Sequence, residues 1–373
     1  MHSLITALLG IIGAWSCRRH NGPDSLGCGW RVAAGVAGGL FPHLDIVFQL
    51  LTIQFGLAHH YAESWSLLLA PVYALLMAFI FQRLARGGRP EDEGRHSWQQ
   101  FYLPVLCGLV VVLLFSMLTA VGVMPFAPVW RVRVTGSLIF MFDYVMLGLC
   151  VLGVVVGLTF RAFVRDIARI TLGVLLVYAL VLLTFQFKAA DIAKTYAQVR
   201  HLDIKAVHTL PQPLSPLHWR IIVETQDDRL YDTLVHLFLK EEREVRDDTS
   251  RAGRIAALYK PVDKAWWRIY NRFGRDKPAF VADGWQVFEH SAYGWFARFA
   301  VYQGLETYKG LPCAQMRDLR YEGAKSDAKG TFLMCKEGNG WMLFRGRVKD
   351  SDYDFIAKLY DTEAAPAKTL AKD

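Results

Sequence analysis

Two ionisable residues, His43 and Asp45, follow Pro42 inside an otherwise apolar run of the sequence. At membrane depth, an ionisable side chain costs several kcal/mol of free energy unless it is paired or hydrated, so such residues mark candidate sites. Proline lacks a backbone donor and disfavours the helical conformation of the preceding residue, which predicts that a helix breaks at Phe41. A broken helix is tolerated in a membrane only where protein or a wet cavity surrounds it.

Some of the other histidines and carboxylates of the apolar half are predicted to lie at the same end of its helices as this pair. They are His2, His59, His60, Glu63 and Asp143. Side chains of these types, drawn from separate segments, are the ligands that a zinc or manganese site requires. We therefore consider His2, His43, Asp45, His60 and Asp143 as candidate metal ligands. Asp45 or Glu63 is the candidate general base.

Each of these residues also has a structural interpretation. His59 and His60 fit an ordinary solvated loop, and His2 fits a frayed chain terminus. Asp143 fits a helix cap or an ion pair with Arg131 or Arg133 nearby. The pair of His43 and Asp45 is the hardest to explain in this way, because its neighbours in the sequence are apolar.

The composition divides the chain into a membrane half and a soluble half. Of its 373 residues, 53% are hydrophobic, and the mean hydropathy is +0.22. Residues 1–187 contain no lysine, whereas the rest of the chain is rich in charges of both signs. This pattern predicts an α-helical integral membrane domain of about six helices at residues 1–187, followed by a soluble α+β domain.

Six apolar segments are long enough, or nearly so, to cross a membrane, which takes about 20 residues. They are Ser3–Trp15, Val32–Leu57, Ser64–Leu84, Phe101–Val123, Gly136–Phe160 and Ile167–Phe187. The first is short enough to be half-spanning or interfacial, and the second is interrupted at Pro42. Charges follow the first segment rather than precede it, so it is predicted to be a retained helix and not a signal peptide.

The arginines predict the orientation of these helices. Ten arginines lie in the loops at one end of the predicted spans, and only Arg131 and Arg133 lie at the other. Short cytoplasmic loops are enriched in Lys and Arg, so both termini are predicted to lie outside the cytoplasm. If the first helix does not cross, the two termini lie on opposite sides. We expect a multi-pass protein of a bacterial-type inner membrane, with lipid as its partner and the candidate residues at its outer face.

The soluble half is predicted to begin with a linker helix at 188–209, continue as an extracytoplasmic α+β domain at 210–355, and end in a disordered tail at 356–373. The predicted strands are His218–Glu224, Arg317–Tyr321, Thr331–Lys336 and Trp341–Val348, with a turn at Gly338–Gly340. Tyr231–Leu239 fits a strand or a helix. The aromatic spacing of Ile255–Phe273 and Trp285–Gln303 predicts two helices.

Two further observations limit the possible functions. The net charge of +8 comes from charges of both signs that are interspersed along the soluble half, which argues against nucleic-acid binding. The six cysteines contain no CxxC pair. Only Cys313 and Cys335 are candidates for a disulfide, and only if the soluble domain lies outside the cytoplasm.

Several motifs, taken in order, resemble those of the YdjM-type family of inner-membrane metal-dependent hydrolases. The family pattern D-S-L-T-H-A-L-L-G resembles His2–Gly10, F/L-P-D-x-D resembles Phe41–Asp45, and H-R-G-x-T-H-S-L resembles His60–Leu67. The pattern H-L-L-L-D-L-L-T-S-Y-G resembles Val112–Gly122, and a following I-D resembles Phe142–Asp143. In the tail, P-x-P-x-x-P-x-x-W is similar to Pro211–Trp219, and D-L-R-Y/F is similar to Asp318–Tyr321.

The resemblance implies a metal-ligand set that is only partly retained in this chain. The family's ligand positions correspond to His2, Thr6, His43, Asp45, His60, Trp65, Val112, Ser116 and Asp143. Thr6, Trp65, Val112 and Ser116 are not usual metal ligands. Two interpretations follow. Either a remodelled site holds a divalent ion and hydrolyses a lipid-like or phosphoester substrate, or the site is degenerate and the chain is a non-catalytic membrane scaffold that acts through its C-terminal domain.

Overall fold

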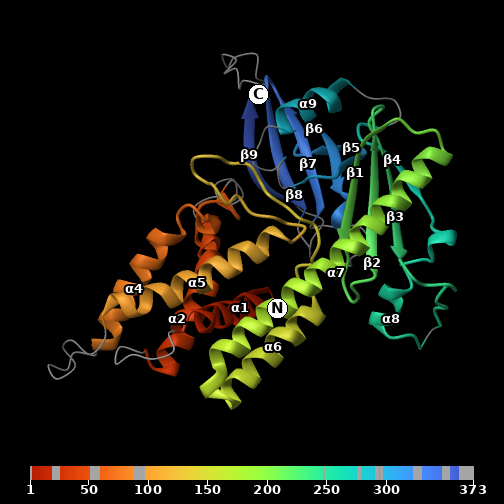
Figure 1. Ribbon diagram of the computed structural model, residues 1–373. Helices are drawn as coiled ribbons and strands as arrows, with labels where there is room; N and C mark the ends of the chain where they lie inside the picture. The colour runs from red at the N-terminus through yellow and green to blue at the C-terminus, as the bar shows by residue number, and fades with distance from the viewer. Residues whose placement is uncertain are drawn as a thin grey trace.

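The protein combines a helical N-terminal part with a C-terminal part built on two antiparallel sheets (Figure 1). This computed structural model describes residues 2–18, 26–50, 59–86, 97–246, 248–274, 279–289, 294, 297–321, 330–346 and 353–360. The predicted division into a helical part and an α+β part is confirmed.

The helical part follows the predicted apolar segments. Its elements are α1 (His2–Ser16), α2 (Cys28–Leu40), the 3-10 helices η1 (Phe41–Leu50) and η2 (Glu63–Trp65), α4 (Ala70–Arg86), α5 (Trp98–Met117), α6 (Tyr144–Thr159), η4 (Arg161–Phe163) and α7 (Val164–Val199). Within the described ranges, Trp98–Met117 and Arg161–Val199 are long and apolar enough to cross a membrane. His2–Ser16, Ala70–Ala85 and Tyr144–Thr159 are shorter apolar helices.

Helix α1 lies at the centre of the helical part. Ile5, Leu9, Ile12 and Trp15 are at most 2% exposed, and they belong to one core that also contains residues of α5, α6 and α7. Such burial explains why this short helix is apolar on almost every side. It also fixes the position of His2, the first residue of α1, against the loops at one end of the helices.

Glycines let the backbones of α1 and α2 approach closely. A Cβ atom added to Gly10 would lie 2.1 Å from the carbonyl oxygen of Gly35, and one added to Gly39 would lie 2.2 Å from that of Thr6. Gly35 and Gly39 are four residues apart on one face of α2, a spacing that is common where membrane helices pack tightly. This contact brings the end of α2, where His43 and Asp45 follow, against the start of α1.

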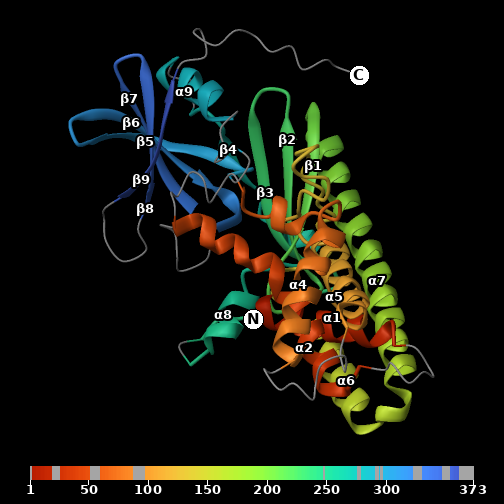
Figure 2. The same ribbon diagram turned by 90° about the vertical axis from the view of Figure 1, so that its left-hand side faces the viewer.

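Helix α7 joins the two parts of the molecule. Its 36 residues span about 54 Å at 1.5 Å per residue, which exceeds the apolar thickness of a bilayer. The last third presents Ala189, Ala193 and Ala197, all at most 1% exposed, to Trp219 and its neighbours in the first sheet. Figure 2 shows α7 running from the helical part along β1. The helical continuation predicted after Phe187 is confirmed as far as Val199.

The C-terminal part contains two antiparallel sheets in simple sequential order. The first consists of β1 (Ile204–Pro211), β2 (His218–Thr225), β3 (Arg229–His236) and β4 (Arg268–Asn271). The second consists of β5 (Ala300–Tyr308), β6 (Leu311–Asp318), β7 (Thr331–Glu337), β8 (Gly340–Gly346) and β9 (Tyr353–Tyr360). The helical elements of this part are α8 (Arg251–Ala256), η5 (Val262–Lys264), α9 (Ala279–Glu289) and η6 (Leu319–Tyr321).

Most of the predicted strands are confirmed. The strand at His218–Glu224, the two strands around the Gly338 turn, and the hairpin partner that begins near Tyr231 match β2, β7, β8 and β3. Gly338 has a φ of +58°, which explains the glycine in this turn. The predicted strand Arg317–Tyr321 is wrong beyond Asp318, because a 3-10 turn follows there.

The two helices predicted in the soluble half are largely wrong. Only Arg251–Ala256 is helical near the start of the first, and Arg268–Asn271 forms β4. The second is helical only to Glu289, and Ala300–Tyr308 is β5. The spacing of the aromatic residues in these segments fits a helix or a strand. Pairing with β3 makes Arg268–Asn271 a strand, and pairing with β6 makes Ala300–Tyr308 a strand. Strand β9 also reaches Tyr360, so it includes residues assigned to the tail that begins at 356. Residues 361–373 lie outside the described part.

A disulfide joins the middle strands of the second sheet. Cys313 of β6 and Cys335 of β7 are paired directly in the register, and their sulfur atoms are bonded. The sequence left this pairing open. Disulfides of this kind persist in oxidising compartments, so the bond agrees with a soluble domain outside the cytoplasm.

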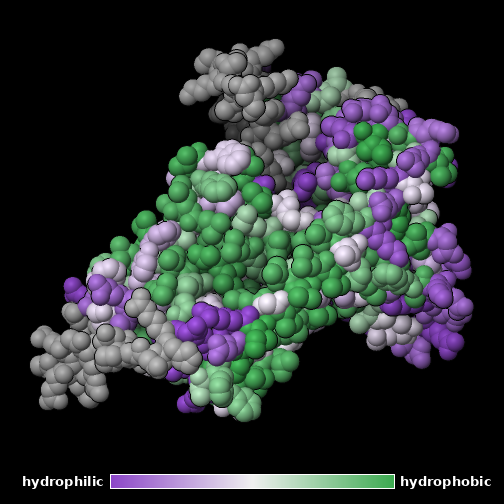
Figure 3. All heavy atoms as spheres, in the orientation of Figure 1, coloured by the Kyte–Doolittle hydropathy of each residue, from purple (hydrophilic) through white to green (hydrophobic). Residues whose placement is uncertain are grey.

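The surface separates into apolar and polar regions along the same division. Large apolar side chains are exposed along α4, α6 and α7, including Val72 (60%), Leu152 (59%), Leu176 (62%) and Val177 (61%). Figure 3 shows a wide hydrophobic surface over the helical part and hydrophilic residues over the sheets. An apolar surface of this extent on a set of helices is typical of contact with lipid.

Candidate functional site

The predicted break at Phe41 is confirmed, and it places the two polar residues. Helix α2 ends at Leu40, and the chain continues from Phe41 as η1. Asp45 is only 2% exposed, whereas His43 is half-buried. A buried carboxylate requires hydrogen-bond partners, because burying a charge without them costs much more than any single contact returns.

Three donors meet one oxygen of Asp45. Its Oδ2 accepts hydrogen bonds from Nδ1 of His60 (2.8 Å), Nε1 of Trp65 (3.1 Å) and the backbone N–H of Tyr61 (3.1 Å). Tyr61 has a φ of 60°, an unusual value for a bulky residue, and this conformation presents its N–H to the carboxylate. The hydrogen bonds therefore bring together His60 and Asp45, as the sequence predicted, with Trp65 as an unpredicted third partner.

His43 and His2 complete the group. The hydroxyl of Thr6 donates to the carbonyl oxygen of Ser3, and its oxygen lies 3.0 Å from Nε2 of His43. The ring centroid of His2 lies 5.2 Å from that of His43 and 6.2 Å from that of Trp65. Among the described residues, neither buried ring nitrogen of His2 has a hydrogen-bond partner.

We call this group the Asp45 cluster. It consists of His2, Thr6, His43, Asp45, His60, Tyr61 and Trp65. Its side chains come from α1, η1, η2 and the turn before η2. The sequence missed Thr6, Tyr61 and Trp65 as members, although Thr6 and Trp65 stand at positions where the family pattern has ligands. Within the cluster they donate or accept hydrogen bonds instead.

Two other candidate residues have structural partners. Glu63 forms an ion pair with Arg131. Asp143 is the N-cap of α6: its Oδ1 accepts from the backbone N–H of Met146 (2.9 Å), and its Oδ2 accepts from the hydroxyl of Tyr178 on α7 (2.8 Å). Of the alternatives for Asp143, the helix cap is the one observed.

The remaining replaced positions lie in the core. Val112 and Ser116 are on α5 and at most 1% exposed. The hydroxyl of Ser116 donates to the carbonyl oxygen of Val112 in its own helix (2.8 Å). Both side chains are therefore used in packing within the helical part.

The described side chains do not form a ligand set for zinc or manganese. Such sites need three or more converging donor atoms. Among the residues that the structure describes, no group of three or more histidine, cysteine, aspartate or glutamate side chains is arranged to hold a metal ion. In this arrangement Oδ2 of Asp45 and both oxygens of Asp143 accept hydrogen bonds from protein groups.

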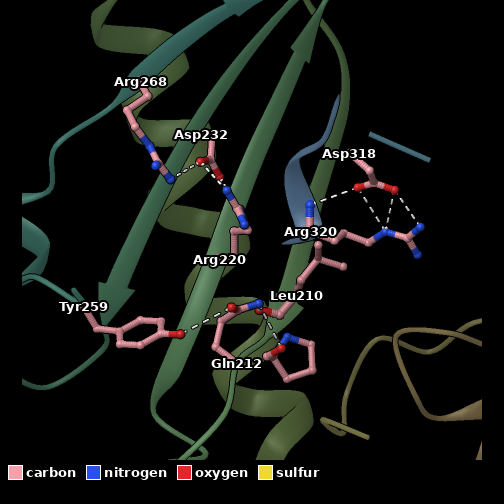
Figure 4. Close-up of polar contacts among 9 residues, drawn as sticks. Leu210, Gln212, Arg220, Asp232, Tyr259, Arg268, Asp318 and Arg320 are labelled. Carbon is pink, nitrogen blue, oxygen red and sulfur yellow. Dashed lines mark hydrogen bonds and ion pairs between the residues drawn. The ribbon is translucent and has the colours of Figure 1, made fainter. Parts of the chain in front are cut away.

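The motifs of the C-terminal part also have structural roles. Nε1 of Trp219 donates to the carbonyl oxygen of Pro216 (3.0 Å), which ties the proline-rich segment to β2. Asp318 accepts hydrogen bonds from the guanidinium and the backbone N–H of Arg320. Figure 4 shows this pair and, as a separate group, the buried carboxylate of Asp232, which is held by Arg220 and Arg268.

Comparison with known proteins identifies relatives of the helical part. The sequence model of the family described as YdjM inner membrane protein matches residues 1–192, which is more than half of the chain. The match begins at α1 and ends within α7, so it contains every member of the Asp45 cluster. No curated protein and no solved structure matches the chain.

Proposed function

The chain belongs to the YdjM inner membrane protein family, and on this premise we propose that it is a multi-pass membrane protein whose C-terminal domain carries its function. In this proposal the Asp45 cluster is a structural remnant of a metal site and performs no hydrolysis. The domain lies outside the cytoplasm and presents a binding surface next to the membrane.

The arrangement of helix ends supports this topology. Nη1 of Arg18 donates to the carbonyl oxygen of Arg161 (2.9 Å), and Nε of Arg169 donates to that of Ser16 (3.1 Å). These arginines therefore gather at the start of α7, about 54 Å of helix away from the end that contacts the first sheet. By the positive-inside rule, the end of the helices that carries these arginines faces the cytoplasm. The C-terminal domain, at the other end of α7, then lies outside.

The hydrogen bond from Trp65 to Asp45 is the observation that carries the proposal. A tryptophan stands where the family pattern has a ligand histidine, and its indole N–H points at the carboxylate. The indole nitrogen has only a proton to offer and no lone pair for a metal. It satisfies Asp45 as a hydrogen-bond acceptor, which is what a stable cluster without a metal requires.

Complementation of a strain that lacks the gene tests this proposal. We expect the variant His43→Ala with His60→Ala to restore the wild-type phenotype, because neither ring takes part in the function. Deletion of residues 201–355 should abolish complementation although the membrane helices remain. The opposite pattern, loss with the histidine variant, would refute the proposal, provided that both proteins reach the membrane in equal amounts.

One observation favours a second candidate, an active metal-dependent hydrolase. His2 presents two buried ring nitrogens without partners among the described residues, next to His43. A divalent ion held by rearranged His2, His43 and His60 would satisfy them, with Asp45 orienting His60 as carboxylates orient ligand histidines in zinc sites. The substrate would be a lipid-like ester or phosphoester at the outer face. Asp45 or Glu63 is the candidate base.

An activity assay separates the two candidates. The hydrolase predicts that purified protein with added zinc or manganese cleaves a chromogenic ester or phosphoester, and that Asp45→Asn reduces the rate at least a hundredfold, as loss of a general base does. Equal rates for the wild type, Asp45→Asn and Glu63→Gln would exclude it. Asp166→Asn provides the matched comparison, because Asp166 is an exposed carboxylate in the first turn of α7, outside the Asp45 cluster.

A further inference from the structure

A polar pocket lies where the membrane helices meet the first sheet. It is about 140 Å³ in volume and is lined by Thr135, Gly136, Ser137, Gln186, Val207, His208, Thr209, Leu210 and Arg298. We call it the junction pocket. Its walls come from the loop before α6, from α7, from β1 and from the segment before β5, four elements that are far apart in the sequence (Figure 1).

Hydrogen bonds fix the membrane-side wall of this pocket. Nε2 of Gln186 donates to the carbonyl oxygens of Gly136 (2.9 Å) and Ser137 (3.4 Å). The hydroxyl of Thr135 donates to the carbonyl oxygen of Thr119 (2.9 Å) and lies 3.2 Å from that of Ser137. The wall is therefore tied to α7 and to the end of α5, and it holds two hydroxyl groups side by side.

The opposite wall carries positive charge. Nη2 of Arg298 lies 3.3 Å from Nδ1 of His208 on β1. Nε2 of His208 lies 3.6 Å from Glu224, but this carboxylate is also bound by Lys205 (2.9 Å) and Arg272 (3.2 Å). Glu224 is thus bound directly by Lys205 and Arg272, and it attracts Arg298 only from farther away.

More arginine charge lies behind the pocket. The pKa of Arg133 is lowered to about 10, first by burial and then by the positive charges of Arg320 and Arg298. Arg320 is bound to Asp318. Arg133 donates to the carbonyl oxygens of Val121 and His60 and does not line the pocket. Arg298 lines the pocket, and among the described residues Glu224 and Asp318 attract it only from beyond ion-pair distance. An arginine without a directly bound carboxylate at a partly enclosed site attracts an anion.

We expect the pocket to lie near the height of the lipid headgroups, because Gln186 stands at the end of the apolar stretch of α7. Gln186 is next to Phe187, the last residue of the apolar stretch of α7, which is 61% exposed, and Lys188 follows. Exposed aromatic residues followed by a cation are typical of the boundary between the lipid tails and water. An anion at this height is bound in the same plane as the phosphates of the outer leaflet.

We infer that the junction pocket binds a phosphate group, either the headgroup of a phospholipid or a free phosphate. Arg298 is the charged partner, and the hydroxyls of Ser137 and Thr209 are the hydrogen-bond donors, because the hydroxyl of Thr135 already donates to Thr119. The inference rests on the proposed binding role of the C-terminal domain and names its ligand class. Such a ligand would fasten the domain to the helices, because its contacts come from both parts.

Two probes distinguish the sources of the phosphate. Full-length protein in nanodiscs of zwitterionic lipid is titrated with inorganic phosphate by calorimetry, and detergent-solubilised protein is analysed by native mass spectrometry for retained phosphatidylglycerol. We expect the wild type to bind at least one probe. Arg298→Gln should weaken that binding about tenfold, as loss of a charged hydrogen bond does. Arg251→Gln, the same change at an exposed residue of α8, should leave it unchanged.

The outcomes decide between support and refutation. Calorimetric binding alone indicates a free anion, and retained phosphatidylglycerol alone indicates a headgroup. Either result supports the inference when Arg298→Gln weakens the binding and Arg251→Gln does not. Absence of both, or equal losses in the Arg298 and Arg251 variants, overturns it. Because the readout is binding and not complementation, the inference can fail while the proposed role of the C-terminal domain stands.

Discussion

The two halves of the molecule each bury a carboxylate, and they hold it in different ways. Asp232 on β3 is 0% exposed and is bound by Arg220, at 2.7 Å and 2.8 Å, and by Arg268. Asp45 in the helical part is 2% exposed and is bound by an imidazole, an indole and a backbone amide. Fixed cations hold the first, and donors that carry no permanent charge hold the second.

This difference separates a structural ion pair from a cluster that contains chemically versatile side chains. Arginine is charged at every physiological pH, so Asp232 has one arrangement that the fold maintains. Histidine gains and loses a proton near neutral pH and can bind a metal, so Asp45 lies among groups suited to chemistry. Trp65 cannot bind a metal at its position, because its indole N–H can only donate a hydrogen bond. The cluster retains the residue types of a site without its ligand geometry.

Removal of Asp232 should have the largest effect on stability. Asp232→Ala removes the carboxylate that binds the guanidinium of Arg220, which is 1% exposed. We expect a loss of about 3–5 kcal/mol in the free energy of unfolding, seen as a large fall in the thermal midpoint. Asp227→Ala is the control, because its pair with Arg229 is exposed and such pairs contribute less than about 1 kcal/mol. A similar fall for both variants would contradict this account.

Acid should destabilise the C-terminal part through His218. Burial, and after it the positive charge of Arg243 and the neighbouring His236, lowers the pKa of His218 to about 4 from 6.5, although a bond to Pro213 opposes this. The unfolded chain then binds more protons than the folded one between these values, so stability falls as the pH falls from 6.5 to 4, by about 2–3 kcal/mol.

Thermal unfolding between pH 7 and pH 4 measures this dependence. His218→Gln should flatten the profile, and the exposed His201→Gln should leave it as in the wild type. An unchanged profile in His218→Gln would show that other groups cause the acid sensitivity.

The stability of the helical part should depend mainly on the close packing of α1 against α2. Gly39→Ala drives a Cβ atom against the carbonyl oxygen of Thr6, in a contact between two backbones that cannot move independently. We expect a loss of about 2 kcal/mol, within the range measured for overpacked cores. Gly173→Ala on α7 is the matched control, because a Cβ there meets nothing within 4 Å. Equal thermal midpoints for the two variants would refute the close contact of α1 with α2.

Removal of the charge of Asp45 should have the smallest effect. Asp45→Asn keeps an oxygen acceptor for Trp65 and His60, so we expect a loss of only about 1 kcal/mol. No permanent cation loses a bound carboxylate, in contrast to Asp232→Ala. A loss above about 3 kcal/mol would mean that a cation, metal or imidazolium, neutralises Asp45.

Local chemistry in the sequence was enough to predict the break at Phe41 and most of the strands. Pro42 disfavours the α-helical conformation of Phe41, where α2 ends, and alternating residues around a glycine turn select a hairpin. His60 and Asp45 were grouped from the sequence only as candidate metal ligands, and the hydrogen bond between them was not predicted. The helices predicted at Ile255–Phe273 and Trp285–Gln303 failed because their aromatic residues pack equally well in a strand, and only the neighbouring strands decide.

Contacts between distant segments were beyond the reach of the sequence. The central position of α1 depends on Gly35 and Gly39 of another helix. The bond of Trp65 to Asp45 depends on a turn that brings the indole next to the carboxylate. Arg298 and Thr135 are more than 150 residues apart and meet only because α7 carries the sheet back over the helices.

The metal content of the purified protein tests the central claim most directly. Full-length protein is purified in detergent without chelators, and zinc and manganese are measured by mass spectrometry, alongside the variant His43→Ala with His60→Ala. The account predicts well under one equivalent of either metal, the same for both proteins, and no change in thermal midpoint on adding a chelator. About one equivalent in the wild type that disappears in the variant would contradict it and establish the Asp45 cluster as a working metal site.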